Sequence, residues 1–336
     1  MEAISEFQLL SPTTLAGVLE ARKAHPLAQL LGGGTDLVVN IRRGIVAPPV
    51  LIDINGVAEL RAIKAGAKAL EIGASVTLSE VANHPGVIAN FAVVAQAAAS
   101  IAGPTHRNMG TVGGNLCLDT RCIFYNQSEW WRSANNHCLK TTGDVCHVAP
   151  KSRGVCFATF SGDLAPALMT LDAEVDIAHP KGKRTLPLKD LYIGHARHDG
   201  SGAGDGKHYL ALKPGEFITA VRAKTTPGLR SAYDKIRIRR SIEYPVAGVA
   251  VALRRDGDKL ADLRVAITGT NPRPVLLEGT RELCGGALDE RVFKGLEELV
   301  RDQIMSMKTT FTPGHYRRRV AGVLARRLVL RLFAGA

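Results

Sequence analysis

Short apolar runs and stretches with helical spacing alternate along the first hundred residues. The runs at 7–10, 27–31 and 50–54 are each brief and stop at polar residues or glycines, a pattern that predicts strands. The stretch 89–102 is rich in alanine and predicts a buried helix, which the Gly-Pro pair after it ends. Strands and helices therefore both contribute to this part of the fold.

A second set of elements follows a change in composition near residues 225–228. Apolar runs at 246–253 and 260–268 flank an Asp-Gly turn and predict two paired strands. Two helices are expected after them, and the last one, at 316–333, has arginines around an apolar stripe. That helix could dock on a membrane or a partner, but packing on its own domain is the simpler expectation.

Composition narrows the class of protein. The chain has 336 residues, 46% of them hydrophobic and 22% charged, so we expect more than one soluble globular domain. No apolar run approaches the roughly 18–20 residues that span a bilayer. The first residues are acidic and lack a signal-peptide pattern, which favours a cytoplasmic location.

The net charge of +12 raises the question of an acidic partner. Nucleic acid is not expected, because the basic residues are dispersed, aromatic residues make up only 5%, and no nucleic-acid-binding motif is present. An acidic protein partner, such as an electron carrier, is compatible with this charge.

Two glycine-rich loops are candidates for binding a phosphate. The loop 32–36 reads Gly-Gly-Gly-Thr-Asp and the loop 111–115 reads Thr-Val-Gly-Gly-Asn. Glycines let backbone N–H groups converge on an anion. The first loop is not a Rossmann fingerprint, because Leu37 stands where the third glycine belongs, and no Gly-Lys-Ser/Thr follows for a P-loop. Together the loops could hold one pyrophosphate from two sides.

Four cysteines cluster between the second glycine loop and an acidic Ser-Gly-Asp-Leu element at 161–164. They are spaced as Cys-x15-Cys-x7-Cys-x9-Cys: Cys122, Cys138, Cys146 and Cys156. Cytoplasmic thiols stay reduced, so metal ligation is favoured over disulfides. The spacing suits a [4Fe–4S] cluster, and zinc or unligated thiols remain alternatives. His137 and His147 flank these cysteines and could be ligands or neighbours of the site.

The motifs together resemble a known family. The runs 31–37 (LGGGTDL), 111–117 (TVGGNLC) and 163–168 (DLAPAL) are similar to the FAD-binding subunits of molybdenum hydroxylases, the relatives of xanthine and carbon monoxide dehydrogenases. The resemblance implies an α+β fold. It would comprise a two-lobed FAD-binding domain of the vanillyl-alcohol-oxidase type (PCMH-like) at 1–225 and a C-terminal α+β domain of the CO dehydrogenase flavoprotein type at 228–336.

The resemblance also implies which residues contact FAD. The two loops would hold the pyrophosphate, and further residues would lie near the flavin ring. The implied set is Leu31, Gly32, Gly33, Gly34, Thr35, Asp36, Ile101, Thr111, Val112, Gly113, Gly114, Asn115, Asp163, Tyr192, Ile218 and Lys235. Core packing is as good an explanation for Tyr192. No residue reads as an acid, base or nucleophile acting on a substrate.

The chain departs from the ordinary family pattern by an insert at about 120–160. Its runs 121–128 (RCIFYNQS), 131–132 (WR) and 146–150 (CHVAP) resemble the insert of the β subunits of 4-hydroxybenzoyl-CoA reductases. The resemblance implies a [4Fe–4S] cluster held by the four cysteines of the insert. The resemblance further implies a molybdopterin-binding catalytic subunit, a [2Fe–2S] subunit, a dimer of heterotrimers and ferredoxin as the electron donor. Two alternatives are an FAD subunit of an oxidative molybdenum hydroxylase and a zinc-binding protein without redox function.

Overall fold

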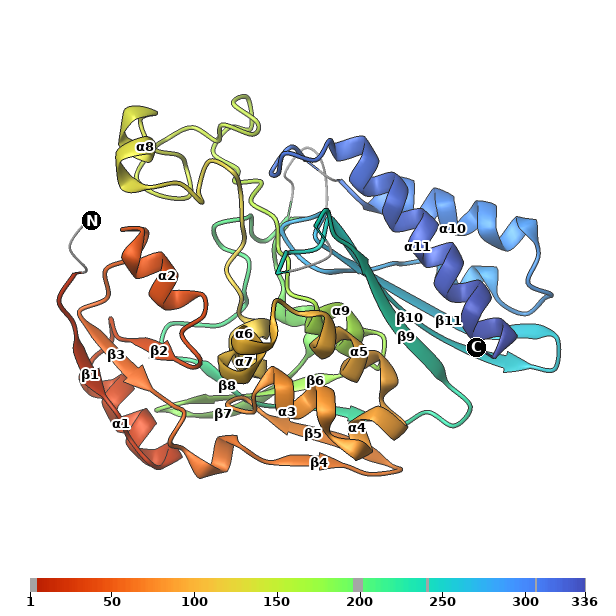
Figure 1. Cartoon of the computed structure of the whole chain (residues 1–336), viewed down its shortest axis with the longest axis horizontal. Helices are drawn as coiled ribbons and strands as arrows, with labels where there is room; N and C mark the ends of the chain where they lie inside the picture. Colours follow the sequence, from red (N-terminus) through yellow and green to blue (C-terminus); the bar gives the residue numbers. More distant parts are fainter. Residues whose placement is uncertain (1–4, 196–201, 240–241, 306, 336) are drawn as a thin grey trace.

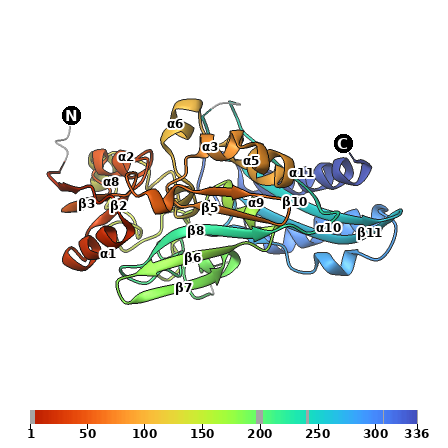
Figure 2. The same ribbon diagram turned by 90° about the horizontal axis from the view of Figure 1, so that it is seen from below.

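The structure is a computed structural model that describes residues 5–195, 202–239, 242–305 and 307–335. The first four residues, which contributed to the expectation about a signal peptide, lie outside this range. Three sheets succeed one another along the chain, and Figures 1 and 2 show them in that order across the molecule.

The first sheet is small and parallel, with strand order β1-β3-β2. It is flanked by helix α1, whose cap is the Thr14 hydroxyl, accepting a hydrogen bond from Gly17 N at 3.1 Å. The elements are β1 (Gln8–Leu10), α1 (Leu15–Ala24), β2 (Gln29–Leu31), α2 (Leu37–Arg42) and β3 (Val50–Asp53). The strands that the apolar runs predict are therefore present.

The second sheet is antiparallel, with strand order β4-β5-β8-β6-β7. Its strands are β4 (Ile63–Ala65), β5 (Ala69–Gly73), β6 (Glu174–His179), β7 (Gly182–Pro187) and β8 (Phe217–Lys224). Strand β5 pairs with β8, so that Ala69 lies opposite Lys224. This sheet is assembled from segments more than a hundred residues apart in the sequence.

Short helices cover the second sheet, and all but the one at 104–109 contribute buried residues to its apolar core. They are α3 (Leu78–Asn83), α4 (Pro85–Asn90), α5 (Ala92–Ser100), α6 (Pro104–Met109), α7 (Val112–Leu116) and α9 (Leu164–Met169). The helix expected at 89–102 is shorter than its apolar stretch, because Phe91 has a non-helical backbone between α4 and α5. The described part of the chain also contains three short 3-10 helices: η1 (Ala58–Leu60), η2 (Leu188–Leu191) and η3 (Thr280–Leu283).

The third sheet forms the C-terminal part and is antiparallel, with order β12-β11-β10-β9. Its elements are β9 (Arg230–Ile236), β10 (Ala247–Asp256), β11 (Lys259–Thr268), β12 (Val275–Leu276), α10 (Glu290–Gln303) and α11 (Gly314–Ala334). Helix α11 buries Ala321, Leu324 and Leu328 in the core of this sheet, so it packs on its own domain. Within the described residues, no helix is long and apolar enough to cross a bilayer.

The cysteine-bearing segment 120–160 is an excursion whose two ends meet. Arg121 and Thr159 exchange two backbone hydrogen bonds of 2.7 Å, and helix α8 (Glu129–Ala134) lies between them. Arg132 donates to Arg43 O at 2.8 Å at the end of α2, and Ile123 N donates to Thr309 O at 2.9 Å. The segment therefore bridges the N-terminal lobe and the C-terminal part, as Figure 1 shows.

Candidate functional site

The two glycine loops are in direct contact, which explains why they need glycine. A Cβ on Gly33 would lie 1.7 Å from Met109 O, and one on Gly32 would lie 2.7 Å from the Thr111 hydroxyl. Gly34 has a φ of +69°, the left-handed region that glycine adopts freely. Any side chain at Gly33 would push the loops apart. The predicted pair of loops therefore forms one continuous backbone surface.

That surface is one wall of a cavity of about 730 Å³. The volume falls within the range of roughly 300–1,000 Å³ that is usual for ligand and cofactor sites. Twelve of the sixteen residues expected to contact FAD line it: Gly32, Gly33, Gly34, Thr35, Asp36, Ile101, Thr111, Gly113, Gly114, Asn115, Asp163 and Ile218. The glycine cradle and the size of the cavity fit a dinucleotide.

The other four predicted residues lie behind the lining. Leu31 belongs to β2, where it pairs with Asp53, and Val112 is buried in the core. Tyr192 differs most from the prediction. Its hydroxyl donates to Leu116 O at 2.9 Å, and its ring packs edge-on against Phe160 at 5.0 Å between centroids. Tyr192 is a core residue here, because its polar end is already satisfied by the backbone.

Lys235 reaches the cavity through Asp163. Its ammonium lies 3.0 Å from Asp163 Oδ2 and is almost fully buried, and the Tyr233 hydroxyl donates to the other carboxylate oxygen. Burial, and then the charge of Asp163, raises the pKa of Tyr233, so its proton stays on the phenol. Asp163 in turn faces the cavity. This cluster fixes the carboxylate at the edge of the cofactor site.

Several cavity residues carry no motif that could have identified them from the sequence. Arg22, His106, Asp119 and Tyr244 all line the cavity. Arg22 comes from the last turn of α1, its guanidinium donates to Ala28 O, and burial lowers its pKa. These residues come from separate elements, so only the folded chain brings them together.

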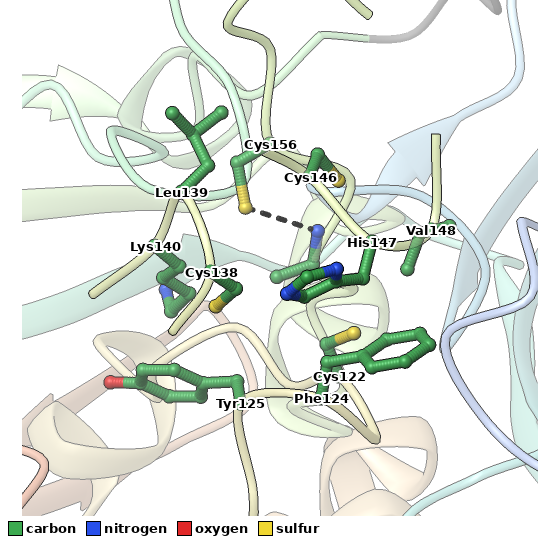
Figure 3. Close-up of a pocket in the computed structure, with 11 residues that line it drawn as sticks. Cys122, Phe124, Tyr125, Cys138, Leu139, Lys140, Cys146, His147, Val148 and Cys156 are labelled. Carbon is green, nitrogen blue, oxygen red and sulfur yellow. Dashed lines mark hydrogen bonds between the residues drawn. The ribbon is translucent and has the colours of Figure 1, made fainter. Parts of the chain in front are cut away.

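The four cysteines of the segment 120–160 line one pocket. Cys122, Cys138, Cys146 and Cys156 are all buried and surround the imidazole of His147, as Figure 3 shows. Burial raises the pKa of Cys122 to about 11 and that of Cys156 to about 12. The nearby Lys140 ammonium opposes the shift at Cys156. The thiols of Cys122 and Cys156 therefore hold their protons more tightly than a free cysteine does, and a bound metal would have to displace those protons.

The donor set suits a thiolate-bound metal group, but the side chains are not yet arranged around one. In the part of the chain that the structure describes, no three or more His, Cys, Asp or Glu side chains are placed as ligands of one metal ion. The pocket has a volume of about 10 Å³, near the minimum for one water molecule. His147 packs against Phe124 at 5.2 Å within it. A cluster would require His147 and its neighbours to shift.

Arg121 connects the cysteine segment to the first glycine loop. Its guanidinium donates to the Asp36 carboxylate, to Asn40 Oδ1 at 2.9 Å and to Asn126 Oδ1 at 3.1 Å. Asp36 and Asn40 both line the large cavity. The planar fork of one buried arginine therefore joins two residues of the large cavity to a residue of the cysteine segment.

Comparisons with known proteins agree with this geometry. Residues 5–223 match the family model of the FAD binding domain in molybdopterin dehydrogenase, and residues 231–332 match that of the CO dehydrogenase flavoprotein C-terminal domain. The fold and the cavity thus define a flavoprotein, and the predicted fold class is confirmed. The chain belongs to the FAD-binding subunits of the molybdenum hydroxylase family and is an oxidoreductase subunit.

Several curated proteins and solved structures are similar to this chain over most of its length. The chain is 32% identical over 294 residues to the aldehyde oxidoreductase FAD-binding subunit of Escherichia coli K12, which covers 85% of this chain and 88% of that one. It is 27% identical to the carbon monoxide dehydrogenase medium chain of Hydrogenophaga pseudoflava, over 76% and 71% of the two chains. The fold matches that of CO dehydrogenase from Oligotropha carboxidovorans with a TM-score of 0.79 and 23% identity, over 99% and 100% of the chains.

Proposed function

We propose that this chain is the FAD and [4Fe–4S] subunit of a molybdenum enzyme of the 4-hydroxybenzoyl-CoA reductase type. The observation that carries the proposal is the gathering of Cys122, Cys138, Cys146 and Cys156 around one pocket beside the cavity for FAD. Four thiolates in a chain with FAD suit electron transfer. The overall reaction would add two electrons and two protons to 4-hydroxybenzoyl-CoA, giving benzoyl-CoA and water.

In this proposal the substrate reacts on another subunit. The partners are a molybdopterin-binding catalytic subunit and a [2Fe–2S] subunit, in a dimer of heterotrimers in the cytoplasm. Ferredoxin is the proposed electron donor. The bound FAD and iron–sulfur group would supply single-electron transfer, while this chain holds them through its glycine loops and cysteines. The net charge of +12 is compatible with an acidic donor protein.

The test is an anaerobic visible and EPR spectrum of the purified complex, with iron, zinc and flavin quantified per copy of this chain. We expect one FAD, and four irons beyond those of the [2Fe–2S] subunit. Cys138→Ser should remove these four irons and slow ferredoxin-dependent turnover while FAD stays bound. Cys284→Ser, in the C-terminal part, is the matched control and should change neither. Zinc in place of iron, or no extra iron, would overturn the reductase proposal.

The names of the relatives favour a second candidate, an FAD subunit of an oxidative molybdenum hydroxylase. They include aldehyde oxidoreductase, carbon monoxide dehydrogenase and nicotinate dehydrogenase subunits. In that case the flavin of the complex would be reduced rapidly by an oxidisable substrate, and no low-potential donor would be needed. Anaerobic stopped-flow absorbance of the flavin, with reduced ferredoxin or an aldehyde as the reductant, distinguishes the two candidates.

A further inference from the structure

Asp119 links the cavity for FAD to the cysteine pocket through two hydrogen bonds. This half-buried carboxylate lines the large cavity. Its Oδ1 accepts a hydrogen bond from Lys140 Nζ at 2.7 Å, and its Oδ2 accepts one from the Tyr125 hydroxyl at 2.7 Å. Lys140 and Tyr125 both line the cysteine pocket. One carboxylate of the large cavity therefore contacts two residues of the cysteine pocket.

Lys140 is held in a fixed, buried position. Only 5% of its side chain is exposed. Besides Asp119, its ammonium donates to the Thr120 hydroxyl at 2.6 Å and to Gly206 O at 2.8 Å, and it lies 4.9 Å from the centre of the Tyr125 ring. Among the residues that line the cysteine pocket, Lys140 is the one lysine or arginine.

The chemistry of a thiolate site gives such an ammonium a role. Four thiolates around a metal group place net negative charge in a buried pocket, and a nearby cation stabilises that charge. The reduction potential of an iron–sulfur cluster depends on net charge and hydrogen bonding around it. Asp119 opposes this effect, because its negative charge offsets that of Lys140 from the side of the large cavity.

We propose that Lys140 and Asp119 form a charge pair that positions and tunes the group in the cysteine pocket and couples it to the cavity for FAD. Lys140 stabilises the negative charge of the thiolate-bound group, and Asp119 limits how much positive charge the pocket experiences. This inference rests on the proposed function for the identity of the group. An electron added to that group then changes the electrostatic potential at Asp119, which lines the cavity for FAD.

Neutralising each member of the pair should shift the midpoint potential in opposite directions, whereas a purely structural role predicts no such opposition. In the intact complex, Lys140→Gln should lower the midpoint potential of the iron–sulfur EPR signal, and Asp119→Asn should raise it. Lys207→Gln is the matched control. Lys207 is exposed, and its ammonium donates to Leu139 O of the same pocket at 3.2 Å. This control should leave the potential unchanged. Shifts in the same direction for both pair variants, or no shift in either, would overturn the proposal.

A further variant keeps the test decisive where Lys140→Gln fails to assemble. Tyr125→Phe removes one hydrogen bond to Asp119, so the carboxylate keeps more of its negative charge and offsets more of the positive charge of Lys140. The midpoint potential of the iron–sulfur signal should therefore fall in Tyr125→Phe and rise in Asp119→Asn. If the wild-type complex holds no iron, the proposed function fails. The pair is then judged by Co²⁺ titration of the thiols, where Lys140→Gln should weaken binding several-fold and Asp119→Asn should tighten it; equal or parallel affinities would overturn it.

Discussion

The ammonium of Lys235 lies 3.0 Å from Oδ2 of Asp163, and this buried contact joins the C-terminal sheet to the domain that holds the cavity. Lys235 belongs to β9, and Asp163 precedes α9. Both side chains are almost inaccessible to solvent, so each charge depends on the other. Breaking a buried pair leaves an uncompensated charge, which typically costs about 3–5 kcal/mol.

Lys235→Met should therefore lower the stability of the protein by about 3 kcal/mol and reduce FAD retention. Removing both charges with the double substitution Lys235→Met and Asp163→Asn should cost less than the sum of the two single changes, because no charge is left unpaired. The measurement is urea unfolding together with the FAD content of the complex. Strict additivity of the three variants would contradict the paired role.

Gly33→Ala should remove most of the FAD from the purified chain. The added Cβ would meet the Met109 carbonyl, which is backbone and cannot rotate away. Gly66→Ala is the matched control, because a Cβ there has no neighbour within 4 Å. The ratio of flavin absorbance to protein measures the effect. Full flavin content in Gly33→Ala would show that the two loops can separate without loss of the cofactor.

Arg121→Lys should weaken FAD binding about tenfold, which corresponds to about 1.4 kcal/mol. A lysine keeps the charge but cannot contact Asp36, Asn40 and Asn126 at once, because it lacks the planar fork of arginine. FAD dissociation followed by flavin fluorescence gives the affinity.

The control for that prediction is Arg61→Lys, at an exposed pair in which Arg61 lies 3.0 Å from Glu80. Exposed pairs contribute about 0–1 kcal/mol, so this variant should bind FAD like the wild type. Equal affinities for Arg121→Lys and the wild type would mean that the insert does not support the first glycine loop.

Alkaline pH should destabilise the protein partly through Cys117. Burial raises the pKa of its thiol from 9.0 to about 12. The folded state therefore keeps this proton more tightly than the unfolded chain. The resulting stabilisation is complete below about pH 9 and is lost as the pH rises from about 9 to 12.

Cys117→Ala lacks this titration. The difference in urea unfolding midpoint between the wild type and Cys117→Ala should shrink as the pH rises from about 8 to about 11. A difference that is constant over this interval would show that Cys117 ionises with an ordinary pKa in the folded state.

The glycine loops could be picked out from the sequence because a run of glycines is conspicuous by itself, although the contact that requires Gly33 comes from the distant Met109. The structure leaves no room for a side chain at position 33, and the sequence accordingly has a glycine there. The strand pair at 246–253 and 260–268 was also predictable, because its turn and its apolar runs adjoin; β10 and β11 do pair. In contrast, the break at Phe91 could not be read from an apolar stretch, since Phe91 is as apolar and as buried as the residues of α5 that follow it.

Contacts between distant segments were not predictable. The sequence indicated four cysteines of similar context, but it did not show that Lys140 meets Asp119 or that Arg121 meets Asp36. The role of Tyr192 could not be predicted either, because a buried aromatic residue next to a cofactor and one in the core have the same sequence pattern. The carbonyl of Leu116 that binds Tyr192 lies 76 positions earlier.

The pairing of β5 with β8 places a constraint on how the flavoprotein matures during synthesis. Ile218 and Phe217 of β8 line the cavity, and their strand completes a sheet begun about 150 residues earlier. A ribosome must therefore release about two thirds of the 336 residues before the β8 wall of the pocket for FAD can form. Cofactor capture is thus a late event for the nascent chain, and an N-terminal fragment that ends before β8 would remain without flavin.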